Sequence, residues 1–138
     1  RYLMARGILS ETQRDPRFSG QVRQDPKGNA IFPHFDSSGL SGYELKNKDF
    51  TGFSRGGTKG LWFSTNVNRS DRVVVVESAI DALSHAQESG DKGAAYLSTG
   101  GSLGHRQRAL LVTAIERAAA RGASIVIATD ADKGGDEM

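Results

Sequence analysis

The sequence predicts an α/β protein with a parallel sheet and flanking helices, preceded by a small, mostly antiparallel β subdomain with a short N-terminal helix. Two observations lead to this prediction. Residues 71–138 alternate apolar runs with helical segments, whereas residues 20–63 hold short apolar runs separated by turn-forming residues. The polar segment TNVNRSD (65–71) lies between the two patterns. We therefore expect a basic N-terminal subdomain over residues 1–70 and an α/β domain over residues 71–138.

The first half begins with YLMAR (2–6), which has the composition of a short helix that Gly7 would end. Clusters of Gly, Pro, Asp and Ser then mark turns at residues 25–29, 36–39 and 54–60. Three partly apolar runs adjoin these turns: AIFPHF (30–35), YELKN (43–47) and GLWFS (60–64). We expect the three runs to pair as an antiparallel meander.

The second half contains three strand-like runs with helical segments between them. RVVVV (72–76) is continuous and β-branched, which is typical of a strand buried on both faces. AAYLS (94–98) and SIVIAT (124–129) are the other two expected strands. Residues 78–89 have helical character, and a second helix is indicated by apolar residues spaced three to four apart: Leu110, Leu111, Ala114, Ile115, Ala118 and Ala119. This order predicts parallel strands joined by right-handed crossovers.

The composition excludes several classes of protein. The 138 residues contain no cysteine, which rules out a disulfide scaffold, a Cys-ligated zinc site and a thiol nucleophile. No apolar run approaches the ~20 residues of a membrane span, and no signal peptide is visible. We therefore expect a cytoplasmic protein with no membrane partner. Because the chain starts without methionine and stops just after an acidic cluster, we also expect it to be part of a larger multidomain protein.

The charge is distributed unevenly along the chain. The net charge is +2, but residues 1–70 hold eleven Lys and Arg against six Asp and Glu, and residues 71–138 hold seven against ten. This division indicates one part that binds an anion and another that could bind a cation. The alternative is an unevenly charged surface without a ligand.

Carboxylates follow two of the three expected strands. Glu77 comes directly after the first strand, and Asp130 and Asp132 come directly after the third. Because the carboxyl ends of parallel strands meet at one edge of a sheet, these side chains are expected to lie together. Asp81 lies one helical turn after Glu77. Oxygen ligands without Cys or clustered His suit Mg²⁺ or Mn²⁺.

Each of these carboxylates also has an explanation that needs no metal. Glu77 could lie at a helix N-terminus, where the helix dipole favours an anion. Asp130 could cap a following helix, and Asp132 could be a turn residue. Like charges gathered at one sheet edge repel each other unless a cation or lysine compensates, so the set as a whole favours the metal site.

Basic and aromatic residues are interleaved in the first half. The set comprises Lys46, Lys48, Arg55 and Lys59, with Phe50, Phe53 and Trp62 between them or nearby. Such a set could hold phosphates and stack bases. The alternative is a solvated hairpin whose aromatic side chains fill the small core, which we prefer for Phe53 and Trp62.

Two segments of the second half, VVVVESAIDAL (73–83) and VIATDADKGGDEM (126–138), resemble the Toprim domain of DnaG-type bacterial primases, type IA and type II topoisomerases and some nucleases. The resemblance implies that Glu77 does acid–base or metal-associated work, commonly with Asp81, and that Asp130 and Asp132 hold Mg²⁺. It also implies a further helix and strand beyond Met138.

Segments of the first half look like the domain that precedes Toprim-like segments in plasmid mobilisation and conjugation (relaxase-associated) proteins. They are YLMARGI (2–8), GNAIFPHFD (28–36), GLSGYELKN (39–47) and FSRGGTKGLW (53–62). DnaG-type primases also carry a basic subdomain at this place.

Together these resemblances imply a bacterial protein with primase-like, Mg-dependent nucleotidyl transfer in plasmid replication or mobilisation. Its partners would be DNA, expected to be single-stranded, and nucleoside triphosphates. Two alternatives stay open: a Mg- or Mn-dependent nuclease that uses the same carboxylates with water as nucleophile, and a non-catalytic DNA-binding module of a mobilisation protein.

Overall fold

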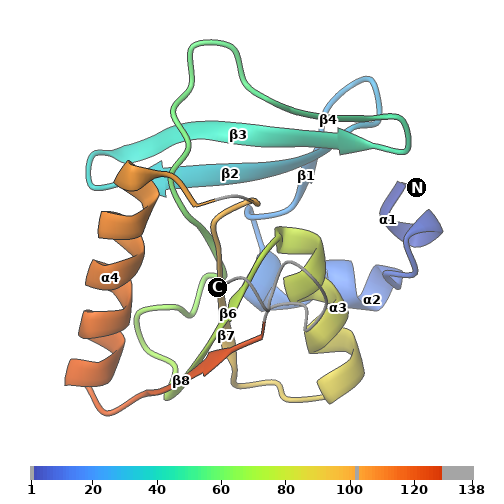
Figure 1. Ribbon diagram of the computed structural model, residues 1–138. Coiled ribbons are helices and arrows are strands. Elements are labelled where there is room, and N and C mark those ends of the chain that lie inside the picture. Colours follow the sequence, from blue (N-terminus) through green and yellow to red (C-terminus); the bar gives the residue numbers. More distant parts are fainter. Residues whose placement is uncertain (1, 102, 129–138) are drawn as a thin grey trace.

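The computed structural model describes residues 2–101 and 103–128. In chain order the first half contains α1 (Tyr2–Ala5), α2 (Ser10–Gln13), a 3-10 turn (Pro16–Phe18), β1 (Arg23–Gln24), β2 (Ala30–Asp36), β3 (Gly39–Asn47), β4 (Phe50–Phe53) and β5 (Trp62–Phe63). The second half contains β6 (Arg72–Val76), α3 (Ala79–Ser89), β7 (Ala95–Ser98), α4 (His105–Ala120) and β8 (Ser124–Ile127). Figure 1 shows these elements arranged as two sheets with helices beside the second.

The first sheet is the predicted antiparallel meander, with the strand order β1-β2-β3-β4. A two-residue turn joins β2 to β3, and Gly39 at its end has a φ of +112°, which only glycine adopts readily. The expectation that residues 60–64 continue this meander is wrong. Trp62 and Phe63 pair instead with Ser98 and Leu97 of β7, in the second sheet.

Burial of Trp62 explains this pairing. Its side chain is fully buried, stacks at 6.1 Å on Phe18 and donates from Nε1 to the carbonyl of Gln21 at 2.7 Å. A meander strand of the first sheet would leave the indole without these partners. The expected core role of Trp62 is thus confirmed.

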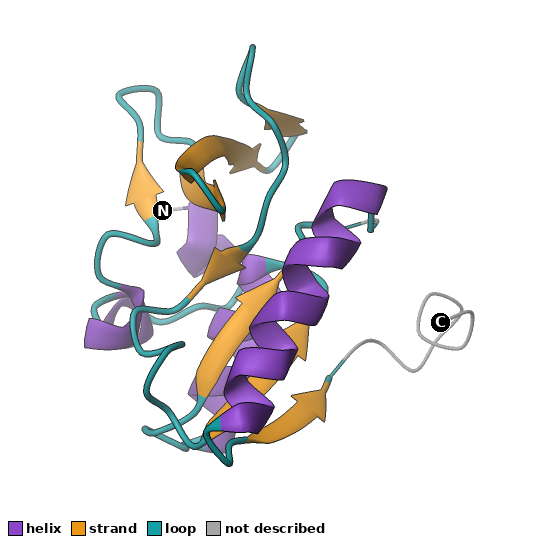
Figure 2. Cartoon of the chain, turned by 90° about the vertical axis from the view of Figure 1, so that its left-hand side faces the viewer, coloured by secondary structure: helices purple, strands orange, loops and turns teal. Residues whose placement is uncertain are grey.

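The second sheet has the strand order β5-β7-β6-β8, in which β6 is parallel to both β7 and β8 and β5 is antiparallel to β7. The predicted α/β class with parallel strands and flanking helices is confirmed. Val74 and Val76 of β6 face a core that includes Ile80 and Leu83 of α3. The alternate valines of β6 face the opposite core, against which α4 packs. The helices therefore cover opposite faces of the sheet, with α4 in front of the strands in Figure 2.

The two sheets meet where β2 ends. Phe35 and Leu61 exchange main-chain hydrogen bonds of 2.8 and 2.9 Å, so the segment that leads into β5 is tied to β2 before it enters the second sheet. In Figure 1 the first sheet consequently lies across the end of the second sheet at which β6 and β7 finish. In the part of the chain that the structure describes, no helix is long and apolar enough to span a membrane.

Candidate functional site

The three parallel strands end in register at one edge. Val76 of β6 pairs with Ser98 of β7, and Val75 pairs with Ile127 of β8. Ala128, the last described residue, donates its N–H to the carbonyl of Val75 at 2.8 Å. Whatever side chains follow these strands therefore leave the sheet at the same edge, as the sequence predicted.

Glu77 and Asp81 stand at this edge, around the first turn of α3. Glu77 follows β6 directly and is half-buried. Ser78 is the N-cap of α3, and its hydroxyl accepts the main-chain N–H of Asp81 at 3.1 Å. Both carboxylates are thus near the positive end of the helix dipole, the position that also explains them without a metal.

The other two predicted metal ligands, Asp130 and Asp132, lie outside the described residues. Among residues 2–101 and 103–128, no group of three or more His, Asp or Glu side chains comes together in a way that could hold a metal ion. The metal site at this edge stays a prediction.

A glycine loop lies next to Glu77. It follows β7 as Thr99, Gly100 and Gly101, and the N–H of Gly101 donates to the main-chain carbonyl of Glu77 at 2.8 Å. Thr99 Oγ1 donates to the carbonyl of Gly101 at 2.9 Å, and the N–H of Gly100 donates to Ser98 Oγ at 3.0 Å. Gly100 and Gly101 have φ values of +73° and +112°, so this path requires glycine.

A buried acid–base pair, which the sequence did not single out, faces this loop from the first sheet. His34 of β2 is fully buried and Glu44 of β3 is 3% exposed, and His34 Nε2 lies 3.0 Å from Glu44 Oε1. His34 Nδ1 lies 3.1 Å from the carbonyl oxygen of Gly60 and 3.2 Å from the Gly60 nitrogen, whose N–H is directed at it. Because a carboxylate only accepts hydrogen bonds, the Nε2 N–H donates to Glu44. Phe53 packs edge-on against the imidazole, with ring centroids 5.2 Å apart.

Glu44 is held as a carboxylate. Burial alone would raise the pKa of Glu44, but the hydrogen bond from His34 and the positive charges of Lys46 and Lys59 outweigh burial and lower it. Lys46 Nζ lies 3.9 Å from Glu44 Oε2. The junction between the two sheets therefore carries a buried negative charge with cationic neighbours.

Gln107 ties the same loop to α4. Its side chain is buried and its Nε2 donates to the carbonyls of Thr99 and Gly60, at 2.6 and 2.9 Å. Its Oε1 accepts the N–H of Gly104 at 3.2 Å, at the start of α4. The loop after β7, the segment before β5 and the start of α4 are thus joined by one amide side chain.

The predicted basic set is divided by the fold. Lys59 donates to the carbonyl of Gly100 at 3.5 Å, and Lys46 lies beside Glu44, so both stand at the glycine loop. Lys48 instead lines a separate cleft of about 430 Å³ together with Arg6. Arg55 is exposed in the turn after β4. The structure brings two of the four cations to the candidate site.

An irregular hairpin register explains why the sequence did not reveal the buried pair. Phe32 pairs with Glu44 and His34 with Gly42, which puts His34 and Glu44 diagonally adjacent on one face of the sheet. The missing side chain at Gly42 leaves room for Phe53, since a Cβ there would lie 2.5 Å from that ring. The register shifts between His34 and Phe35. Regular counting back from the turn at residues 37–38 would pair His34 with Ser41 and put Glu44 on the opposite face, so the contact depends on this irregularity.

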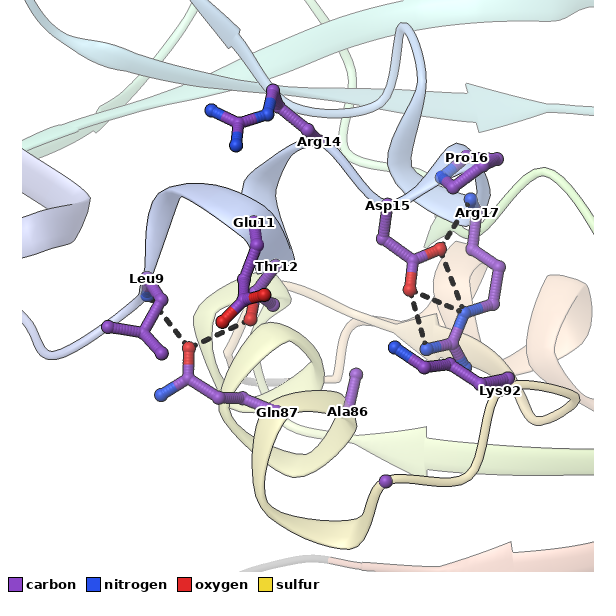
Figure 3. Close-up of a pocket in the computed structure, with 11 residues that line it drawn as sticks. Leu9, Glu11, Thr12, Arg14, Asp15, Pro16, Arg17, Ala86, Gln87 and Lys92 are labelled. Atoms are coloured by element: carbon purple, nitrogen blue, oxygen red, sulfur yellow. Dashed lines mark hydrogen bonds and ion pairs between the residues drawn. The ribbon is translucent and has the colours of Figure 1, made fainter.

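A pocket of about 620 Å³ between α2 and α3 has a structural explanation (Figure 3). On its wall, Arg17 is bound to Asp15 at 2.9 Å and donates to the carbonyls of Asp91 and Ala94 at 2.9 Å each. Gln87 Oε1 accepts from the N–H of Leu9 and the hydroxyl of Thr12. These contacts fasten the N-terminal segment to α3 and to the start of β7, the end of the sheet opposite to Glu77.

Two family models match this chain. Residues 1–70 match the family model described as a protein of unknown function (DUF3991), and residues 74–138 match the model described as Toprim-like. The chain belongs to the DUF3991 family, and its second half is similar to the Toprim-like family. A search of curated proteins gives no match.

Three solved structures similar to this chain are primases. The RNA polymerase domain of Mycobacterium tuberculosis primase DnaG is 17% identical, with a TM-score of 0.49, and the match covers 98% of this chain and 50% of that chain. The Escherichia coli primase catalytic core is 16% identical, with a TM-score of 0.45, and the match covers 96% of this chain and 64% of that chain. The Mycobacterium tuberculosis domain in complex with a double-stranded DNA oligomer with a 6-nucleotide overhang is 18% identical, with a TM-score of 0.48, and the match covers 96% of this chain and 47% of that chain. The chain spans about half to two thirds of the length of these structures.

Proposed function

We propose that this chain is a primase-like Toprim protein that acts on nucleic acid by metal-dependent nucleotidyl transfer. The observation that carries the proposal is the edge at which three parallel strands end in register, with Glu77 directly after the central strand. The Toprim-like match over residues 74–138 supports it, because this stretch includes Glu77, Asp81, Asp130 and Asp132.

The proposed metal ligands are Glu77, Asp130 and Asp132, with Asp81 nearby. The donor chemistry fits a hard cation, since all four groups are carboxylates and the chain has no cysteine. The described chain reaches the edge at Ala128, two residues before Asp130. When bound, Mg²⁺ or Mn²⁺ would stabilise the negative charge that develops on the transferred phosphoryl group.

The residues of the chain would then act on the attacking and the leaving group. Glu77 is proposed to accept the proton of an attacking 3′-hydroxyl or to position a second metal ion. The 3′-oxygen bonds to the α-phosphorus of a nucleoside triphosphate, the bond to the bridging oxygen breaks, and pyrophosphate leaves. Lys46 and Lys59, at the glycine loop, are proposed to hold phosphates of the DNA strand near the reacting centre, and Lys48 and Arg55 would contact the same strand at a distance from it.

The wider setting is part of the proposal. The resemblance of residues 1–70 to domains of mobilisation proteins supports a role in plasmid replication or transfer, with single-stranded DNA as template. We propose that the chain acts in the bacterial cytoplasm as part of a larger protein, with residues 1–70 as a basic subdomain and residues 71–138 as a Toprim domain.

Templated primer synthesis by the full-length parent protein tests the activity. Glu77→Gln and Asp130→Asn should each lower the rate by ~100-fold or more, since each removes a carboxylate from the reacting centre. Glu88→Gln, an exposed position at the far end of α3, is the control and should leave the rate unchanged. Equal activity of Asp130→Asn and wild type would contradict the proposal.

The same assay separates the two alternatives. Metal-dependent cleavage of a labelled strand without added nucleotides, abolished by Glu77→Gln, would identify a nuclease. DNA binding that persists and weakens with salt, while added Mn²⁺ produces no heat in calorimetry, would identify a non-catalytic binding module.

A further inference from the structure

The buried pair His34–Glu44 is in tight contact with the glycine loop. A Cβ built on Gly100 would lie 2.8 Å from Glu44 Oε1 and 2.9 Å from His34 Cε1. Such distances are shorter than van der Waals contact, so Gly100 lies beside the pair with no room for a side chain between them. The loop thus rests against two side chains of the first sheet.

The other side of the loop is joined to Glu77. The N–H of Gly101 donates to the main-chain carbonyl of Glu77 at 2.8 Å. The pair, Gly100, Gly101 and the backbone of Glu77 therefore form one continuous series of contacts from the first sheet to the edge of the second.

The polar side chains of His34 and Glu44 can fix the orientation of the neighbouring segments, which apolar side chains in their place could not do. An apolar pair of the same volume would fill the space without the cost of burying a carboxylate, but it would not fix the orientation of its neighbours. His34 is bound on both ring nitrogens, to Gly60 and to Glu44, so its plane is determined. His34 therefore fixes the position of the segment that contains Gly60 relative to the loop that contains Gly100.

We propose that His34 and Glu44 are positioning residues, which hold the loop of residues 99–101 and thereby the main chain of Glu77 in the geometry that the metal site requires. The proposal rests on the proposed function for its consequence at the metal, whereas the loop contact itself can be tested without any metal. Neither residue is assigned contact with substrate.

Amide hydrogen exchange of the full chain, followed by NMR, tests the loop contact from the side of the pair. Glu44→Leu removes the acceptor of His34 and should speed exchange of the Gly101 amide by ~10-fold or more. Glu44→Gln keeps the volume and an acceptor oxygen, so exchange should stay within ~3-fold of wild type. Asp15→Asn is the matched control, because it removes the charge from a partly buried ion pair at the opposite end of β7.

A second variant perturbs the loop and is read out on the pair, which keeps the test valid if Glu44→Leu does not fold. Gly100→Ala places a Cβ against Glu44 and His34, so the amide of Gly60, whose N–H donates to His34, should exchange ~10-fold faster. Gly90→Ala has nearly the same φ, +70° against +73°, but nothing within 4 Å of its Cβ, and should leave Gly60 unchanged. Exchange at Gly101 and Gly60 that matches the two controls would overturn the proposal.

Mn²⁺ titration by calorimetry separates this inference from the proposed function. Glu44→Leu should weaken Mn²⁺ binding by ~10-fold, as loss of a supporting contact around a metal site does, and Glu44→Gln should restore most of it. If Glu77→Gln abolishes Mn²⁺ binding while Glu44→Leu leaves it unchanged, the positioning role fails and the metal site stands. If Glu77→Gln and Asp130→Asn both leave Mn²⁺ binding unchanged, the proposed function fails, whatever the exchange data show.

Discussion

The main-chain N–H of Gly101 donates to the main-chain carbonyl of Glu77 at 2.8 Å, which joins the loop after β7 to the residue after β6. Two adjacent parallel strands are thereby connected beyond their last paired residues. Strand ends at an exposed edge would otherwise have unpaired main-chain groups. The conformation of Glu77 therefore depends on a loop that also contacts the first sheet.

Gly100→Ala should lower the free energy of unfolding by more than Gly90→Ala. Both substitutions force alanine into the left-handed region, which costs about 1 to 2 kcal/mol. Only Gly100→Ala adds overlap with Glu44 and His34. Urea denaturation of both variants measures the difference, and equal losses would show that the loop can move away from the pair.

Arg17→Met should be among the more destabilising substitutions of a charged residue in this protein. It removes the partner of Asp15 and a donor to the carbonyls of Asp91 and Ala94, and the Ala94 carbonyl keeps only the longer hydrogen bond of 3.3 Å from Asn66. Such a loss costs about 3 kcal/mol. Arg72→Met, which breaks a more exposed ion pair with Asp91 at 3.5 Å, should cost about 0.5 kcal/mol. Chemical denaturation compares the two, and similar losses would contradict the structural role of Arg17.

The stability of the protein should fall at acid pH partly because of Glu44. Its pKa lies below the ordinary value of 4.5 in the folded protein, so its contribution is present above pH 4.5 and is lost as the pH falls through the lowered pKa. Asp15 contributes with the same sign, since its pKa is lowered as well. The free energy of unfolding, measured by chemical denaturation from pH 6 down to pH 3, should therefore fall less with pH for Glu44→Gln than for wild type. A parallel pH dependence of the two proteins would contradict an ionised Glu44.

Trp62 gives a direct optical test of its burial in the core. It is the single tryptophan of the chain and is fully buried between the two halves. Its fluorescence maximum should lie at shorter wavelength than that of the unfolded chain, and iodide should not quench it. Trp62→Phe should lower the free energy of unfolding by about 1 to 2 kcal/mol, because the carbonyl of Gln21 loses its donor and the core loses volume. Emission at the wavelength of a solvated indole would contradict this placement.

Binding of single-stranded DNA should depend on salt through the basic residues at the site. Under the proposed function, Lys46→Gln and Lys59→Gln should each reduce the slope of log K against log salt by about 1. Lys27→Gln, in an exposed turn before β2, is the control and should leave the slope unchanged. Fluorescence anisotropy at several salt concentrations measures the slopes, and three identical slopes would remove these two lysines from the binding surface.

The sequence by itself determined the elements with strong local signals. β6 follows from an uninterrupted β-branched run, and α3 follows from the helical character of residues 78–89, which Gly90 ends. The position of Glu77 at the sheet edge could also be predicted, because the carboxyl ends of parallel strands meet whatever their exact partners are. The periodicity of apolar residues and the order of strands and helices along the chain are local properties, which a single sequence contains.

Only the tertiary structure decided which distant segments touch. Trp62 joined β7 rather than the meander because a buried indole needs partners from both halves, and no local pattern shows those partners. His34, Glu44 and Gln107 looked unremarkable along the chain, since their importance comes from meeting at Gly60 and Gly100. Hydrogen bonds between residues far apart in sequence depend on the packing of the whole fold, which composition and spacing do not specify.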